Sequence, residues 1–195
     1  QKQRAGLLSS VFLLSIFLTA NGVSSIFSSF EGSYHVVLSR SFVRQYLYSM
    51  MVGVLLALVL LVGVTALIFF EIFILSNLDE LIPSEINWIR IGQLFFYTIL
   101  IYISVAILYY FGTIEGKKNR FFSPGALMTC LLILITTYLF GIYIDKFSTY
   151  NQLYGSIGAL LIFLFYIWLN SSVLLLGFEL NATLNRLKNS RKDPT

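Results

Sequence analysis

The strongest constraint on the fold of this chain is a long apolar run at residues 52–70, VGVLLALVLLVGVTALIFF, which contains no charged side chain. A helix that crosses the hydrocarbon core of a bilayer needs about 20 mostly apolar residues. The whole chain has the same bias, because 57% of its residues are hydrophobic and 11% are charged, whereas soluble domains carry about 25% charged residues. The sequence therefore predicts a membrane protein whose outer surface faces lipid.

Five stretches of the chain are long and apolar enough to cross a membrane. Open sheets leave unpaired backbone groups in lipid, and the alternation of about ten residues that marks a membrane barrel is absent, so we expect every span to be an α-helix. The predicted spans are residues 6–30, 47–75, 86–112, 124–144 and 154–184. The predicted fold class is all-α, a polytopic transmembrane helix bundle that forms a single domain over residues 1–195.

Basic residues predict the orientation of this bundle. Of the 13 lysines and arginines, four (Lys2, Arg4, Arg90 and Lys146) fall on one side of the predicted spans and the other nine on the opposite side. Basic segments stay in the cytoplasm, so we expect a cytoplasmic tail at residues 185–195 and an outside start. An odd number of spans with an outside start fits one further span before the first, which makes six with both ends inside.

Single occurrences of histidine and cysteine exclude several kinds of site. The chain has one histidine, His35, and one cysteine, Cys130. One cysteine forms no disulfide within the chain, and neither residue has the convergent ligands of a metal site or the paired base of a nucleophile. The net charge of +4 is explained by loop residues that set orientation. We therefore expect a lipid bilayer as partner, with no metal, cofactor, nucleic acid or enzymatic activity.

Polar residues interrupt the apolar pattern of the predicted fifth span. Asn170 and Ser172 lie near its middle, and Glu179 lies near its cytoplasmic end. Because these groups fall on two faces of a helix, we expect this helix to lie inside the bundle and away from lipid. Asn170 is either a structural hydrogen-bonding group or a substrate contact. Glu179 is either half of an interfacial ion pair or a functional carboxylate.

The predicted first span carries a polar stripe, in which Asn21, Ser25 and Ser28 recur at helical spacing. Such a stripe either joins two helices by hydrogen bonds or lines a polar cavity. The predicted substrate path consists of Asn21, Ser25, Asn170, Ser172 and Glu179.

A second embedded carboxylate, Glu71, lies near the outer end of the second span. Arg90 lies at a similar depth near the outer start of the third span. Charges inside a membrane pair with one another, so we predict an ion pair between these two residues.

The stretch RFFSPGALMT at residues 120–129 has the pattern of a helix start, because Ser123 suits the cap and Pro124 suits the first turn. It is either a capped helix end or a site for an anion, for which a lipid headgroup is the natural occupant. The candidate anion-site residues are Ser123, Gly125, Lys117, Lys118 and Arg120.

Three segments of the chain together resemble the YihY/BrkB family of bacterial membrane proteins. They are SVFLLSIFLTANGVSSIFSSFEGSYHVVLSRSFVRQYLYSM at residues 10–50, FFSPGALMT at residues 121–129, and YNQLYGSIGALLIFLFYIW followed by LLLGFELNA within residues 150–182. Besides path and anion-site residues named above, the family-signature positions are Gly22, Arg40, Arg44, Pro124, Tyr154, Gly155, Gly158, Gly177 and Asn181. The family pattern has alanine where this chain has Phe178.

The resemblance implies an inner-membrane protein of six helices with both ends cytoplasmic, whose first helix and following segment precede this chain. The family has carried ribonuclease and virulence labels and proposals of transport or envelope-lipid roles. We expect a transporter or translocation protein for a small solute, ion or lipid, because polar residues lie on several predicted spans. The alternative is a non-transporting scaffold for envelope assembly, in which those residues only join helices. An integral-membrane enzyme, including a ribonuclease, is the least supported because metal ligands are lacking.

Overall fold

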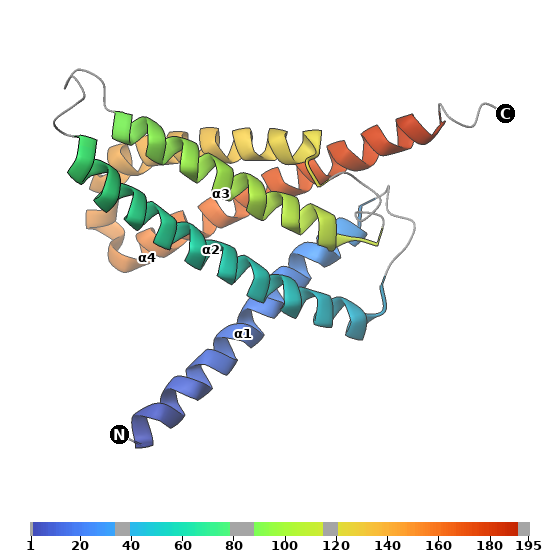
Figure 1. The fold of residues 1–195 in the computed structure, drawn as a ribbon, viewed down its shortest axis with the longest axis horizontal. Helices are drawn as coiled ribbons and strands as arrows, with labels where there is room; N and C mark the ends of the chain where they lie inside the picture. The colour runs from blue at the N-terminus through green and yellow to red at the C-terminus, as the bar shows by residue number, and fades with distance from the viewer. Residues whose placement is uncertain (1, 34–39, 79–87, 115–120, 191–195) are drawn as a thin grey trace.

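The computed structural model of this protein describes residues 2–33, 40–78, 88–114 and 121–190, which form helices and short connections without any strand. The helices are α1 (Lys2–Glu31), α2 (Phe42–Leu78), α3 (Trp88–Gly112) and α4 (Pro124–Ser190) (Figure 1). The predicted all-α fold class is confirmed.

Five helical segments in the described part are long and apolar enough to cross a membrane, as the sequence predicts. They are Leu8–Glu31, Phe42–Phe73, Arg90–Gly112, Pro124–Asp145 and Ile157–Lys188. A helix makes its backbone hydrogen bonds within one segment, so each of these apolar runs can cross lipid without a neighbouring strand to pair with. The chain is therefore a multi-pass membrane protein in a lipid bilayer.

The last two of these segments are the two arms of α4, which folds back on itself. A straight helix would place Gly125 and Asn181, which are 56 residues apart, about 84 Å from each other at ~1.5 Å per residue. Instead, the backbone N–H of Gly125 donates to Asn181 Oδ1 at 2.8 Å. We call Pro124–Asp145 the first arm and Ile157–Lys188 the second arm. They run antiparallel, and the chain reverses at the end of the molecule far from the C-terminus (Figure 1).

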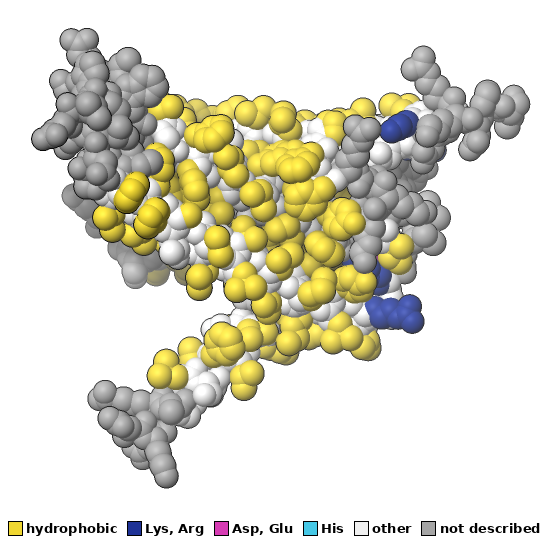
Figure 2. All heavy atoms as spheres, viewed as in Figure 1, with side chains coloured by type: hydrophobic (Ala, Val, Ile, Leu, Met, Phe, Trp, Pro, Cys, Tyr) yellow, Lys and Arg dark blue, Asp and Glu magenta, His cyan; other side chains and the backbone are white. Residues whose placement is uncertain are grey.

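Each helix packs mainly on the next one along the chain, α1 on α2, α2 on α3 and α3 on α4. Figure 1 shows that α1 crosses α2 and that its N-terminal half projects away from the other helices. In Figure 2 the described part of this projecting half shows several hydrophobic side chains on the visible face. Among the described side chains of α1, only those of its C-terminal half, with buried Val23, Phe27 and Phe30, join the core.

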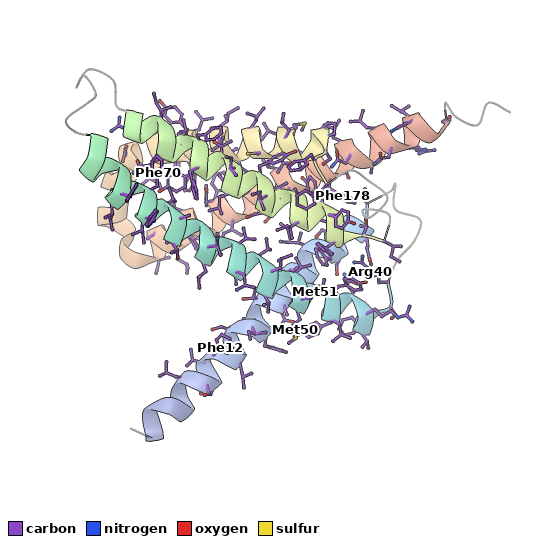
Figure 3. All side chains as sticks on the ribbon, viewed as in Figure 1. Phe12, Arg40, Met50, Met51, Phe70 and Phe178 are labelled. Atoms are coloured by element: carbon purple, nitrogen blue, oxygen red, sulfur yellow. The ribbon has the colours of Figure 1, made fainter. Side chains whose placement is uncertain are left out.

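The core gathers at the end of the molecule where α1 and α3 finish. Phe30 of α1 stacks on Phe178 of the second arm, with ring centroids 4.3 Å apart and planes 9° apart. Tyr109 of α3 meets both rings edge-on, at 5.6 Å from Phe30 and 5.9 Å from Phe178. Figure 3 labels Phe178 between these helices. The phenylalanine that departs from the resembled family pattern therefore fills the centre of the core.

Two glycines allow the arms of α4 to approach closely at this end. A Cβ atom added to Gly177 would overlap Thr129 Oγ1 and would lie 2.6 Å from Tyr109 Oη and 2.9 Å from the carbonyl oxygen of Gly125. A Cβ atom on Gly125 would overlap the carbonyl oxygen of Gly177. Small residues let membrane helices pack backbone against backbone, and here they fix the hairpin of α4.

The second arm does not lie inside the bundle, contrary to the sequence-based expectation. The first half of this arm is exposed on several sides, with Phe163 at 58% and Trp168 at 64% exposure. The physical reason is that two polar groups in this exposed half are bonded within the arm itself. Asn170 Nδ2 donates to the carbonyl oxygen of Tyr166 at 2.9 Å, and Ser172 Oγ donates to that of Trp168 at 3.0 Å. A helix that pairs its own polar groups can face lipid.

The glycine contact gives a direct test of the hairpin. We expect Gly177→Ala to lower the stability of the detergent-purified protein by about 1–3 kcal/mol, the usual cost of overpacking. Gly141→Ala is the matched control, because the space around Gly141 is empty within 4 Å and alanine favours a helix over glycine by ~1 kcal/mol. Thermal unfolding followed by size-exclusion chromatography measures both. Equal midpoints for the two variants would contradict the close approach of the two arms.

Candidate functional site

The polar stripe of α1 lies on the side of the helix opposite its packed face. Ala20, Val23 and Phe27 are buried against the other helices, whereas Asn21 and Ser25 are exposed. At about 100° per residue, Ser25 lies roughly 180° from the mean direction of the buried residues. We name the exposed set the outer face of α1, which consists of Leu14, Leu18, Asn21, Gly22, Ser25 and Ser29.

Asn21 is the unusual member of this outer face. It lies about 2 Å along the helix axis, at ~1.5 Å per residue, from the middle of the span Leu8–Glu31. Within the described residues its carboxamide makes no hydrogen bond, and only its backbone oxygen accepts one, from Ser25 Oγ at 3.0 Å. Transfer of an unpaired amide or hydroxyl from water to hydrocarbon costs about 4–8 kcal/mol. A free carboxamide at this depth therefore needs a partner or water.

The neighbours of Asn21 leave room for such a partner. A Cβ atom added to Gly22 would meet nothing within 4 Å. Ser29 Oγ donates to the carbonyl oxygen of Ser25 at 3.0 Å, so the serines keep to their own helix and form a shallow polar surface. The outer face can receive a polar group or another helix without rearrangement of the core.

One serine of the predicted stripe belongs to a different contact. Ser28 Oγ accepts a hydrogen bond from Gln45 Nε2 of α2 at 3.0 Å, and the same nitrogen lies 3.4 Å from the carbonyl oxygen of Ser24. Gln45 is buried. The stripe therefore divides into a structural contact between α1 and α2 at Ser28 and an open polar face at Asn21 and Ser25.

The remaining residues of the predicted path lie on the second arm of α4. Asn170 Oδ1 accepts from Thr136 Oγ1 of the first arm at 3.5 Å, which joins the two arms. Ser172 is half-buried and bonded within its own helix. Glu179 is half-buried, and it has no hydrogen bond or ion pair to any described residue. No hydrogen bond in the described part joins these residues to Asn21 or Ser25. The predicted path residues therefore do not form one continuous polar surface within the described part of the chain.

The structure does not form the predicted ion pair between Glu71 and Arg90. Both side chains are exposed, and no ion pair joins them in the part of the chain that the structure describes. The reason is the contact between α2 and α3 next to them, where Phe70 faces α3 and would lie 2.9 Å from a Cβ atom on Gly92. Glu71 follows Phe70 by about 100° round the helix, so its side chain leaves in another direction.

The start of α4 is closed by protein groups. Gly125 N–H donates to Asn181 Oδ1 at 2.8 Å, Ala126 N–H to Ser123 Oγ at 3.3 Å and Leu127 N–H to the carbonyl oxygen of Ser123 at 3.2 Å. Proline lacks an N–H, so Pro124 adds none. These bonds leave no N–H of the first turn free for an anion. Lys117, Lys118 and Arg120 of the predicted anion site lie outside the described residues, so that site stays a prediction.

Asn181 is the buried centre of this cap. Its carboxamide accepts from Gly125 N–H and donates through Nδ2 to Ser123 Oγ at 2.7 Å. Beside it, Tyr109 Oη donates to the carbonyl oxygen of Leu174 at 2.6 Å and lies 2.6 Å from Thr129 Oγ1. The polar groups of this region are thus satisfied, which is the requirement for burial in lipid.

Arg40 caps the C-terminal end of α3 in the same region. Its Nη1 donates to the carbonyl oxygens of Phe111 at 2.8 Å and Gly112 at 3.2 Å, the last residues of α3. The guanidinium lies 4.4 Å from the ring centroid of Tyr48, and the Arg40 backbone N–H donates to Glu31 Oε1 at 3.3 Å. Burial lowers the pKa of Arg40 from its ordinary value, and the charge of Glu31 opposes this shift. Arg40 therefore ties the start of α2 to the ends of α1 and α3.

The other signature positions are spread over the structure. Arg44 and Pro124 are exposed, and Gly158 is buried. Tyr154 and Gly155 lie in α4, but their side-chain positions are outside the described residues, and His35 lies outside them as well.

Two further features limit the chemistry of the described region. No group of three histidine, cysteine, aspartate or glutamate side chains in the described ranges is arranged to hold a metal ion. An open groove of about 480 Å³ lies between α2 and α3, but its lining, from Leu58 to Ala66 and from Phe96 to Ile103, is apolar. This groove offers no polar path.

Sequence reasoning missed Gln45, Tyr109 and Thr129. Gln45 had a signal in the sequence, because it is an amide near the start of an apolar span. Ser49, four residues later, is a second polar residue there, and it too is buried. Tyr109 and Thr129 had none, since neither periodicity nor spacing shows which helices become neighbours.

The Asn181 cap can be tested by removing its hydrogen bonds. We expect Asn181→Leu to destabilise the protein by about 1–3 kcal/mol, because it leaves the buried Gly125 N–H without an acceptor. Asn185→Leu, one turn later at a half-buried position, changes the same chemistry without removing a hydrogen bond and should stay within ~0.5 kcal/mol of the parent. Urea or thermal unfolding in mild detergent compares them. A stable Asn181→Leu variant would show that the cap is dispensable.

Comparisons with known proteins agree with a membrane family. YfkH of Bacillus subtilis, which is named a ribonuclease-like protein, is 28% identical over 191 residues that cover 95% of this chain and 68% of that protein. A UPF0761 membrane protein of Xanthomonas campestris is 30% identical over 87 residues, which are 45% of this chain and 20% of the relative. One of Xanthomonas oryzae is 32% identical over 83 residues, or 43% and 20%.

No solved structure matches this chain. The family model described as virulence factor BrkB matches residues 1–195. Because this match covers the whole chain, the protein belongs to the virulence factor BrkB family.

Proposed function

We propose that this protein translocates a small solute, ion or lipid across a bacterial inner membrane, with the outer face of α1 as one wall of the path. The observation that carries the proposal is the carboxamide of Asn21, which has no hydrogen-bond partner among the described residues and lies near the middle of the span Leu8–Glu31. Polar groups at this depth mark pathways or helix contacts. Asn170, Ser172 and Glu179 belong to the path only if a movement or a partner brings them to α1.

The proposed orientation places the tail at residues 185–195 in the cytoplasm. Lysine and arginine side chains gather at the end of the molecule where α2 begins and α4 ends (Figure 2). Among described residues, Arg40 and Arg44 lie around the start of α2 and Lys188 lies near the end of α4, while Arg90 lies in the first turn of α3. Basic segments remain cytoplasmic, which supports this orientation. The same end would meet anionic lipid headgroups at the inner membrane surface.

A non-transporting scaffold is the second candidate, and a separate observation favours it. Most polar side chains inside the spans bond to their own or a neighbouring helix, as Ser25, Asn170 and Ser172 do. Such groups stabilise a bundle without contact to a substrate. Asn21 is a residue on which the two candidates differ, because a scaffold would pair its carboxamide with another helix, whereas a translocation path would leave it open to the substrate.

The ribonuclease-like name of the Bacillus subtilis relative does not enter this proposal. A hydrolase of this kind needs a metal-bound water or a nucleophile with its base. The proposal includes neither a metal-bound water nor a nucleophile with its base, and it assigns no enzymatic activity to this chain.

Flux through liposomes tests the proposal. The full-length protein is placed in vesicles that contain a dye-labelled phospholipid and an entrapped ion reporter. An impermeant reductant should bleach both leaflets, or an imposed gradient should release the ion, faster than in protein-free vesicles. Asn21→Leu should slow the active process about tenfold, since one hydrogen bond to a passing polar group contributes ~1–1.5 kcal/mol. Its thermal stability should be unchanged, because Asn21 has no partner in the described fold.

Thr65→Val is the matched control. Thr65 is exposed on α2, and its hydroxyl donates to the carbonyl oxygen of Leu61 at 2.8 Å, so its loss should leave the flux intact. Lipid bleaching and ion release that both equal those of empty vesicles, at confirmed protein loading, would contradict translocation. A stability loss in Asn21→Leu that matches its loss of function would favour the scaffold.

A further inference from the structure

We propose that the second arm of α4 contains a hinge at Gly177, and that the hydroxyl of Tyr109 switches this hinge by exchanging hydrogen bonds with the backbone of the arm. The groups involved lie in the core, where Tyr109, Thr129 and Phe178 are buried. The hinge is therefore built from the described part of this chain alone. The inference goes beyond the proposed function, because the arm can bend whether or not the protein moves a substrate.

The hydrogen bonds of Tyr109 have fixed directions. A tyrosine hydroxyl has one hydrogen, and that of Tyr109 goes to the carbonyl oxygen of Leu174 at 2.6 Å. Thr129 Oγ1, which lies 2.6 Å from Tyr109 Oη, is therefore the donor in the contact between the two hydroxyls. Through these two bonds a side chain of α3 joins the first arm of α4 to the backbone of the second arm.

The bond to Leu174 interferes with the internal hydrogen bonds of the second arm. In an α-helix each N–H donates to the carbonyl four residues earlier, so the carbonyl of Leu174 is the helical acceptor for the N–H of Phe178. That N–H also lies within hydrogen-bonding reach of the Tyr109 hydroxyl. The hydroxyl therefore competes with one helical hydrogen bond at both its donor and its acceptor. A side chain inserted in this way is a recognised cause of helix bending.

Gly177 allows the hydroxyl to reach the backbone of the second arm. A Cβ atom added to Gly177 would lie 2.6 Å from Tyr109 Oη, so a side chain there would push the hydroxyl away. Glycine also weakens a helix locally, because it has the greatest conformational freedom. A glycine and an inserted hydroxyl thus coincide at one turn of the second arm.

Two arrangements satisfy the buried polar atoms at this turn. In the first, which the structure shows, Tyr109 donates to Leu174 and accepts from Thr129. In the second, Phe178 N–H alone bonds to the Leu174 carbonyl and Tyr109 donates to Thr129 Oγ1. The Thr129 hydroxyl then donates to the carbonyl one turn earlier, as threonines in helices do. Because each hydrogen bond replaces another, the two arrangements are close in free energy.

The two halves of the second arm are held unequally. The second half is held by the cap at Asn181 and by the stack of Phe178 on Phe30. The first half is exposed on several sides, and two side-chain contacts, at 3.5 Å and 2.8 Å, join it to the first arm. A bend at Gly177 therefore swings the first half against a fixed second half. It carries Asn170, whose place on the predicted path requires such a movement.

Distances between two spin labels test the hinge. Leu161→Cys on the second arm and Leu94→Cys on α3 replace exposed residues, and they are labelled in the full-length protein in lipid bilayers with Cys130→Ala. Leu161 lies 16 residues from Gly177, about 24 Å along the helix, so each ~10° of bend moves its label by ~4 Å. Double electron–electron resonance should show two distance populations in the parent.

Two variants should shift these populations in opposite directions. Tyr109→Phe removes the competing hydroxyl, so only the second arrangement remains. Thr129→Val removes the acceptor that Tyr109 needs in the second arrangement and would leave a buried hydroxyl unpaired, so the ratio should move about tenfold toward the first. Tyr110→Phe is the matched control on α3, because Tyr110 makes ring contacts and no hydrogen bond to a described residue. It should match the parent.

The outcomes separate the hinge from a general loosening of the fold. One unchanged distance in the parent and in every variant overturns the hinge. A shift in the same direction in Tyr109→Phe and Thr129→Val overturns it as well, since lost packing alone would give that result. Labels at Leu187 and Phe42, both exposed at the capped end, should keep one distance throughout. A change there would mean that the whole arm moves and would also overturn the hinge.

Flux measured on the same variants distinguishes this inference from the proposed function. Flux above that of empty vesicles, with distances that do not respond to Tyr109→Phe or Thr129→Val, would leave translocation standing and overturn the hinge. Two populations that respond in opposite directions, without any flux, would support the hinge and contradict translocation.

Discussion

The close approach of Gly125 and Gly177 is the contact on which the rest of the fold depends. It brings the two arms of α4 together at one end, because a side chain at either glycine would overlap the opposite arm. The contact places Asn181 over the first turn of α4, where it serves as a cap from the far side of the hairpin. It also presents Phe178 as a flat surface on which Phe30 of α1 stacks. Without this hairpin, the ends of α1 and α3 would lose the surface of Phe178 on which Phe30 and Tyr109 pack.

Lipid as a solvent explains why polar residues in the spans differ in meaning. A hydroxyl or amide in hydrocarbon first bonds to the carbonyl one turn earlier, as Ser25, Asn170 and Ser172 do, and then has little left to offer a substrate. Burial elsewhere is achieved by exchange between helices, as in the Gln45–Ser28 contact. Asn21 does neither within the described residues. A polar residue in a span points to function only when its hydrogen bonds remain unmade.

Hydropathy alone was sufficient to predict the five spans and the all-α fold, because each helix satisfies its own backbone and needs no partner to be recognised. Predictions that depended on which helices become neighbours were less successful. The second arm lies at the surface, with Asn170 bonded within it. Glu71 makes no ion pair with Arg90 in the described part of the chain, where the adjacent Phe70 packs against α3 at Gly92. The polar stripe of α1 was visible in the sequence, but its direction was not. Direction depends on Phe27 and its packing, which only the tertiary structure shows.

The two ends of α1 have opposite mechanical roles. Its C-terminal end is held by the stack of Phe30 on Phe178 and by Arg40, which links Glu31 to the end of α3. Its N-terminal half has few contacts. Local stability follows the number of buried contacts, so a change in tilt of α1 is easier than any change in the α4 hairpin. Such a tilt would pivot about Phe30 and carry Asn21 with it, so α1 is the helix whose movement the described contacts oppose least.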